Sequence, residues 1–280
     1  MGLFTFKEKT TPIPPSRFLQ FFYLIKEHFL LFFTSSICQF IFFLPATYIL
    51  ISTYIRYSNE MNVENPNPII LYQTLISGGL LLLPTLLIGY LGEIGMYSII
   101  KKTAFNEPVE FKDFWCGIKN NYLSNLFILI TTSVLTALVV INYGTYLYGD
   151  INPIIKLIAF IVSIILFLLA SLCKPYYILQ KLIFNNTSIQ ICKNCLTFAF
   201  SKLFKSLGVF ILSNIMLILL LFSVDWLRVL IIVLLIIIGG AYSSLLQYLH
   251  SLSVLETFID KKSYPEIYHN GLNDFYEVKE

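Results

Sequence analysis

The sequence predicts an all-α integral membrane protein with six transmembrane helices arranged as three hairpins. Hydrophobic residues make up 57% and charged residues only 12% of the 280 residues. A soluble domain carries about 25% charged residues, so this chain cannot cover a water-facing surface with polar groups. Several apolar runs are also long enough to cross a bilayer. This composition excludes secreted, disordered and nucleic-acid-binding classes.

Six apolar runs approach the roughly 20 residues that a helix needs to cross a bilayer core of about 30 Å. None of them alternates apolar and polar residues, as the strands of a membrane barrel would. One polytopic membrane domain over residues 1–280 is therefore expected, with a cytoplasmic tail over residues 251–280. The predicted spans cover residues 29–55, 71–97, 122–148, 153–173, 207–222 and 227–248.

The basic residues predict the orientation. All but Arg56, Lys156 and Arg228 of the 19 Lys and Arg residues lie before the first span, after the last one, or in the second and fourth loops. Loops rich in Lys and Arg stay on the cytoplasmic side of a membrane. We therefore expect a multi-pass protein of the cell membrane with both termini in the cytoplasm.

Each odd-numbered span follows a segment that mixes aromatic and basic residues, over residues 18–26, 111–119 and 198–205. Such segments are typical of amphipathic helices that lie on a membrane surface. We expect three interfacial helices that form a basic collar, although plain extensions of the spans would show the same pattern. The aromatic side chains expected to face lipid are Phe18, Phe21, Phe22, Phe114, Trp115, Phe198 and Phe200, and the cations expected to reach headgroups are Lys26, Lys119, Lys202 and Lys205.

Glu93 is the one acid well inside a predicted span, about two turns from Lys101. An acid within a membrane is costly and suggests a substrate or proton site. The alternative is a hydrogen-bond acceptor between helices, because Gly89, Gly92 and Gly95 beside it let another helix approach closely. That packing interpretation predicts that Glu93→Gln preserves folding.

Two prolines, Pro45 and Pro84, fall inside the first two spans and predict helix kinks. At Gly78-Gly79 and Gly239-Gly240, close helix packing is the favoured interpretation and a hinge is the alternative.

The sequence predicts neither a catalytic centre nor a bound metal or cofactor. Cys192 and Cys195 form a C-x-x-C pair, but a zinc site needs two further ligands at comparable spacing. His28 and His250 lie at inner ends of spans, and interfacial histidines without a catalytic role are the favoured interpretation. No nucleophile-elbow, metalloprotease or phosphate-loop motif is present.

Four short motifs give the chain a family resemblance. They are Leu44-Pro45-Ala46-Thr47, Phe111-Lys112-Asp113-Phe114 with Ile118-Lys119-Asn120-Asn121, Tyr176-Tyr177 with the run 193–199, and the start Met1-Gly2-Leu3-Phe4. From the first span through the fifth the chain resembles the YesL-like family of bacterial membrane proteins, known as domain of unknown function 624. Some members of this family are encoded beside carbohydrate uptake systems, so the resemblance implies an accessory role in transport. It implies no agreed functional residues.

Three classes of function stay open at this point. The favoured one is a non-enzymatic membrane protein, surrounded by membrane lipids, that supports a partner such as an ABC-type transporter or another membrane protein. The alternative is a small secondary transporter or channel with a polar site near Glu93, to which Gln39, Asn142 and Gln247 would contribute. A membrane enzyme is least favoured, because no nucleophile and base pair is apparent in the sequence.

Overall fold

The computed structural model describes residues 14–184, 186–222 and 224–272, and the Met1–Phe4 motif lies outside them. This part of the chain is helical and contains no strand. Its elements are α1 (Arg17–Glu27), α2 (Phe29–Met61), α3 (Pro68–Ala104), α4 (Lys112–Tyr148), α5 (Pro153–Ile183), α6 (Ser188–Ser201), α7 (Leu203–Ser213), α8 (Ile215–Phe222), α9 (Asp225–Leu234), a π-helical segment (Leu235–Gly239) and α10 (Gly240–Glu256).

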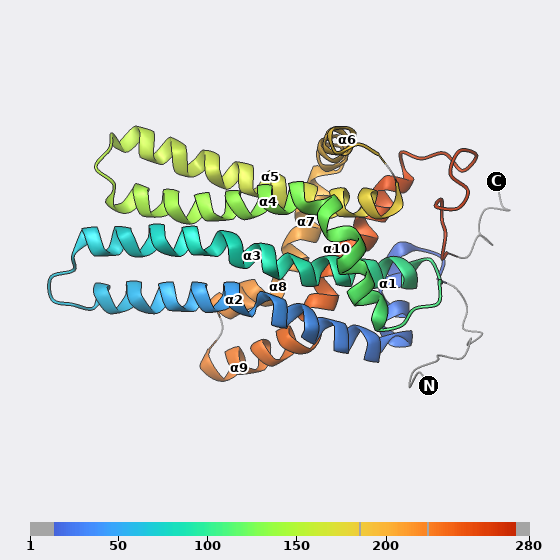
Figure 1. Ribbon diagram of the computed structural model, residues 1–280, viewed down its shortest axis with the longest axis horizontal. Helices are drawn as coiled ribbons and strands as arrows, with labels where there is room; N and C mark the ends of the chain where they lie inside the picture. The colour runs from blue at the N-terminus through green and yellow to red at the C-terminus, as the bar shows by residue number, and fades with distance from the viewer. Residues whose placement is uncertain (1–13, 185, 223, 273–280) are drawn as a thin grey trace.

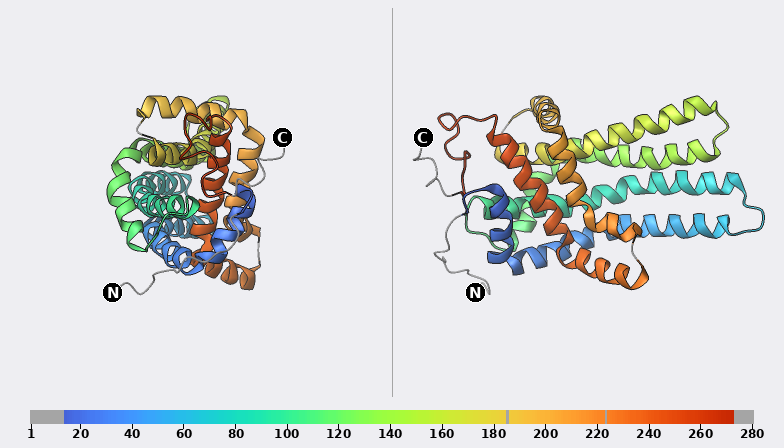
Figure 2. Two further views of the ribbon diagram at one scale, coloured as in Figure 1. Left: turned by 90° about the vertical axis from the view of Figure 1, so that its right-hand side faces the viewer. Right: turned by 180° about the vertical axis from the view of Figure 1, so that it is seen from behind.

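Five helical segments in the described residues are long and apolar enough to cross a membrane. A sixth is reached if α6 and α7, which meet at 93°, are counted as one broken span. The helices are therefore compatible with a membrane helical bundle, as the composition predicts. Helices α2 to α5 run side by side along the long axis, and α7 and α10 cross obliquely the half of them that lies toward α1 (Figures 1 and 2).

The predicted fifth span, 207–222, is not one helix. It is split between α7 and α8 at Asn214, whose Nδ2 donates to the carbonyl of Phe210 at 2.8 Å. Asn side chains compete with the helical backbone in this way, which explains the interruption that hydropathy alone does not reveal. The ends of α8 and α9 that follow one another in the chain lie beside the middle of α2 (Figure 1). They do not reach the 62–67 and 149–152 connections at the far end of the long helices.

The predicted sixth span lies within one helical run, Asp225–Glu256, that is long and apolar enough to cross a membrane, but this run is not regular α-helix throughout. Residues Leu235–Gly239 form a π-helical turn between α9 and α10, and such turns free backbone groups that need other partners. Ser36 of α2 supplies one, because its hydroxyl accepts from the Gly240 amide at 3.2 Å. The predicted tail also begins later than expected, since α10 runs to Glu256 and keeps Ser251 and Leu252 buried.

The segments before the odd-numbered spans take three different forms. Helix α1 is separate from α2, with His28 between them. Helix α6 is separate from α7 and lies across the bundle. The segment 111–119 is not a separate helix but the start of α4, although its first turns also run across the long axis (Figures 1 and 2).

The aromatic side chains of these segments divide between surface and core. Phe18, Phe22, Trp115 and Phe200 are exposed. Phe114 and Phe198 are instead buried in the core, and Phe21 is half-buried. Of the four cations, Lys26, Lys119 and Lys205 are exposed and Lys202 is half-buried.

Helix α3 lies at the centre of the long helices because its glycines admit its neighbours. A Cβ on Gly89 would meet the Phe43 ring, and one on Gly95 would meet the Phe114 ring. A Cβ on Gly92 would lie 2.8 Å from the Gln39 Cα, which belongs to backbone and cannot rotate away. Small residues thus bring α2 and α4 close to α3. The prolines Pro45 and Pro84 lie within α2 and α3, which both continue past them.

We expect Gly92→Ala to destabilise the protein while Gly208→Ala does not. The first change pushes α2 away from α3, and overpacking of this kind costs about 1–3 kcal/mol. Gly208 in α7 has open space where its Cβ would lie, and alanine has the higher helix propensity. Thermal unfolding in detergent would measure both variants. Equal midpoints would contradict the close α2–α3 approach.

Candidate functional site

An ion pair inside the bundle joins Glu93 of α3 to Lys174 of α5. The Lys174 Nζ donates to the Glu93 Oε2 at 2.7 Å, and the side chains are 15% and 7% exposed. The same ammonium lies 4.4 Å from the centre of the Tyr90 ring, a distance at which a cation is attracted to an aromatic face. Both charges are therefore compensated within the helical bundle, as buried charges must be.

The location of Lys174 differs from the one that the sequence predicts. Its place after the fourth apolar run predicts a cytoplasmic loop, yet α5 continues through it to Ile183. Arg17, one of the basic residues before the first span, is buried in an ion pair with Glu256. The basic residues used to predict orientation thus include two that stabilise the interior of the protein.

The Glu93–Lys174 pair lines a cavity of about 420 Å³ between the long helices and the C-terminal helices. Pockets of this volume are typical of small-molecule binding sites. Gln39 and Gln247, two of the polar residues expected near Glu93, line the same cavity. Asn142, the third, does not line it; it lies at the α4–α5 contact with its amide 3.5 Å from the Ala159 carbonyl.

Hydrogen bonds connect the polar side chains of the cavity across four helices. The Tyr97 hydroxyl donates to Gln247 Oε1 at 3.3 Å, and Gln247 Nε2 donates to the Ser213 hydroxyl at 2.8 Å. Gln39 Nε2 donates to the Ser244 hydroxyl at 3.4 Å. The Gln39 Oε1 atom is buried and has no hydrogen-bond partner among the described residues.

Both helix interruptions of the C-terminal half border this cavity. Asn214 separates α7 from α8, while Leu235, Gly239 and Gly240 belong to the π-helical turn and its end, and all four line the cavity. Irregular backbone within a membrane is tolerated where it lines a cavity or is buried in protein. The interruptions therefore coincide with the polar site and are not scattered through the bundle.

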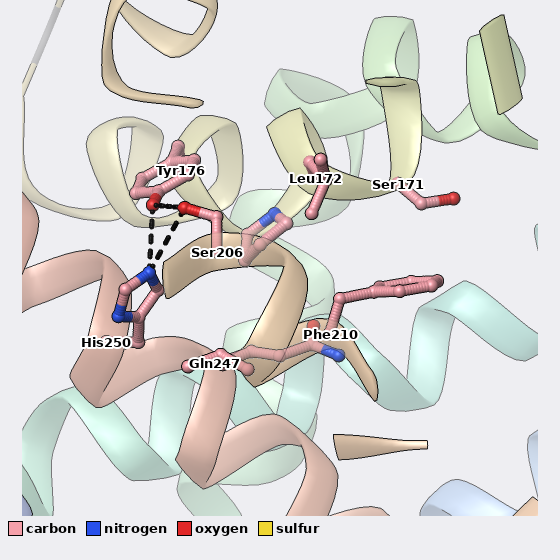
Figure 3. Close-up of a pocket in the computed structure, with 9 residues that line it drawn as sticks. Ser171, Leu172, Tyr176, Ser206, Phe210, Gln247 and His250 are labelled. Atoms are coloured by element: carbon pink, nitrogen blue, oxygen red, sulfur yellow. Dashed lines mark hydrogen bonds between the residues drawn. The ribbon is translucent and has the colours of Figure 1, made fainter. Parts of the chain in front are cut away.

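A second polar cluster lies beside the cavity (Figure 3). The hydroxyls of Tyr176 and Ser206 are 2.8 Å apart, and each lies 3.2 Å from the His250 Nε2. The sequence did not predict that His250 would meet a serine. Gln247 and Phe210 border both this cluster and the larger cavity.

The Tyr176–Ser206–His250 cluster surrounds a space of about 10 Å³, which is about the room that one water needs. A substrate for acyl transfer does not fit there, so the geometry is that of a hydrogen-bonded link between α5, α7 and α10. The C-x-x-C pair lies in α6, where Cys195 Sγ accepts from Gln180 Nε2 at 3.4 Å. No group of three or more metal-binding side chains is found in the part of the chain that the structure describes.

We expect Tyr176→Phe to lower the free energy of unfolding by about 1 kcal/mol, the usual net contribution of one hydrogen bond. Ser206 and His250 keep each other as partners, so the loss should stay small. Tyr48→Phe is the matched control, because Tyr48 is exposed. Equilibrium unfolding in detergent compares the two. An equal effect at both positions would contradict the assignment of Tyr176 to the cluster.

Comparisons with known proteins found no relative of this chain. Neither a protein-family model, nor a curated protein, nor a solved structure matches the chain.

Proposed function

We propose that this chain is a multi-pass membrane protein that binds a polar ligand in the cavity beside Glu93 and carries it across the bilayer. The observation that supports this function is the cavity itself. It gathers Glu93, Lys174, Gln39 and Gln247 from four helices at one place. A transporter needs such a convergence of polar groups inside the membrane, whereas a protein that only supports a partner does not.

The interrupted helices add to this support. Transporters place substrate sites where helices are broken, because the freed backbone groups and half-helices bind the substrate. Here Asn214 and the π-helical turn both border the cavity.

The proposed topology has both termini in the cytoplasm and six crossings in three hairpins. In this arrangement α1, the start of α4 and α6 lie on the inner membrane surface as amphipathic helices. The exposed side chains of Phe18, Phe22, Trp115 and Phe200 support this proposal, because exposed aromatics beside Lys residues favour the interface. The accessory role beside an ABC-type transporter, which the family resemblance implies, remains a separate proposal that co-purification in mild detergent would test.

Cysteine accessibility tests the carrier proposal. The chain has five free cysteines in its described part, which we would replace before introducing Ser243→Cys at the cavity wall. In sealed vesicles, a small charged thiol reagent that does not cross membranes should label this cysteine when added to either side. Alternating access exposes a carrier site to each side in turn.

Ser163→Cys is the control, because Ser163 is buried in α5 and does not line the cavity. It should stay unlabelled under the same conditions. Labelling of Ser243→Cys from one side only, or from neither side, would contradict the carrier function.

A further inference from the structure

The ion pair at the cavity wall indicates which charges a ligand can bring. Lys174 places a primary ammonium against the Glu93 carboxylate and the face of Tyr90. A carboxylate beside an aromatic face is a site for an ammonium of any origin. A ligand ammonium can therefore take the place of the Lys174 ammonium, provided that Lys174 finds another anion.

Charge balance inside the membrane then restricts which charges the ligand can carry. A purely anionic or purely cationic ligand would leave one uncompensated charge inside the membrane, which costs several kcal/mol. A ligand that carries both charges allows an exchange of partners, with its ammonium on Glu93 and its anionic oxygen on Lys174. No net charge is buried in this exchange.

Outward from the charged pair the lining of the cavity is mostly apolar, with Thr47 and Thr136 among its polar members. On α2 the lining continues outward from Gln39 to Leu50, which is about 16 Å along a helix. Leu86 lies two turns outward from Glu93 on α3, and Phe167 lies two turns outward from Lys174 on α5. The cavity thus has a charged inner end and an apolar outer end.

The apolar end points toward the region where the C-terminal helices stop. Leu217 of α8 lines the cavity, and the α8–α9 end lies beside the middle of α2 (Figure 1). Farther out, the long helices have no C-terminal helix against them in this view, so an apolar chain that leaves the cavity there meets lipid. A soluble zwitterion would make no use of this apolar half.

From this arrangement we propose that the ligand is an amphiphile whose head carries a primary ammonium and an anionic group, as the head of an aminophospholipid does. This inference rests on the proposed carrier function and names its substrate class. The head lies between Glu93, Lys174 and Gln39, and the chain extends along α2 toward Leu50.

Lipid binding to the purified full chain in detergent tests the substrate class. The probes are a short-chain phosphatidylethanolamine, a phosphatidylglycerol of the same chain length, and glycerophosphoethanolamine, which carries the same zwitterionic head without acyl chains. Native mass spectrometry counts bound lipids, and thermal unfolding reports the stabilisation that binding produces. Phosphatidylethanolamine should bind at least about tenfold more tightly than either of the other probes.

The double variant Glu93→Gln/Lys174→Met removes both charges of the cavity wall together and should lose this preference. Arg228→Gln is the control, because it removes an exposed ion pair with Asp225 away from the cavity. Should the double variant fail to fold, the three probes still decide the question on the unaltered protein.

Each contrary result has its own meaning. Equal binding of phosphatidylglycerol, or unchanged binding by a folded double variant, would overturn the zwitterionic head. Equal binding of glycerophosphoethanolamine would overturn the apolar chain. If no probe binds while Ser243→Cys is labelled from both sides, the substrate class is wrong and the carrier function stands. If phosphatidylethanolamine binds with the expected preference but labelling fails, the carrier function is wrong and the lipid site stands.

Discussion

Removing one charge of the Glu93–Lys174 pair should destabilise the protein by about 3–5 kcal/mol, because the remaining charge is left uncompensated inside the bundle. Glu93→Gln leaves the Lys174 ammonium without its carboxylate, and Lys174→Met leaves the carboxylate without its ammonium. The double variant should recover most of this loss, since a buried pair and well-packed neutral groups are often similar in stability. Equilibrium unfolding in detergent gives the double-mutant cycle.

Exchanging the two residues of the pair separates the effect of their charges from the effect of the size and shape of their side chains. Glu93→Lys/Lys174→Glu keeps both charges and should fold better than Glu93→Lys alone, which puts two cations together. Additive effects of the two single changes in the cycle would show that the side chains do not interact. If the Glu93→Gln variant is as stable as the unaltered chain, this result would support the interpretation of Glu93 as a hydrogen-bond acceptor between closely packed helices.

Arg17→Met should cost a similar amount, about 3–5 kcal/mol, because it breaks a second buried ion pair. Arg17 donates to both carboxylate oxygens of Glu256, from Nε to Oε2 at 3.3 Å and from Nη2 to Oε1, and both side chains are 7% exposed. Gln20 beside it donates to the Ala104 carbonyl at 2.8 Å. Loss of the guanidinium should therefore release α1 from the ends of both α3 and α10.

Limited proteolysis measures this release separately from global stability. The segment after α10 contacts the same cluster through the His269 amide, which donates to Glu256 at 3.2 Å. It should be cut sooner in Arg17→Met than in Arg228→Met, whose ion pair is exposed and contributes little. Arg17→Lys should rescue only part of the loss, because lysine cannot donate to both oxygens with one planar group. Equal cutting in all three variants would contradict the role of the pair.

The membrane helices could be predicted from the sequence because lipid demands long uninterrupted apolar runs. The run that predicts the first span is one helix in the structure, α2. The interruptions at Asn214 and at residues 235–239 could not be predicted, because one amide or one wider turn barely changes the average hydropathy. They depend on contacts such as that of Ser36 with Gly240, which lie far apart in the sequence.

Only part of the candidate site could be predicted from the sequence. Glu93, Gln39 and Gln247 stand out as polar residues within apolar runs, and the cavity brings them together. Lys174 is 81 positions from Glu93 and follows its apolar run, where a lysine is ordinary. His250 and Ser206 were missed for the same reason: a single sequence carries no signal for which side chains of distant helices face each other.

The position of the α8–α9 end has a consequence for the surrounding lipid. Asp225, Trp226 and Arg228 are exposed there, and exposed charges belong at the water boundary and not in hydrocarbon. Yet α5 begins farther out along the same axis (Figure 1) with exposed Ile154 and Ile155, which belong in hydrocarbon. In the proposed topology the bilayer is therefore thinner against the C-terminal helices than against α5. Such hydrophobic mismatch costs a fraction of a kcal/mol per Å, so a carrier with this topology should gather in thin membranes.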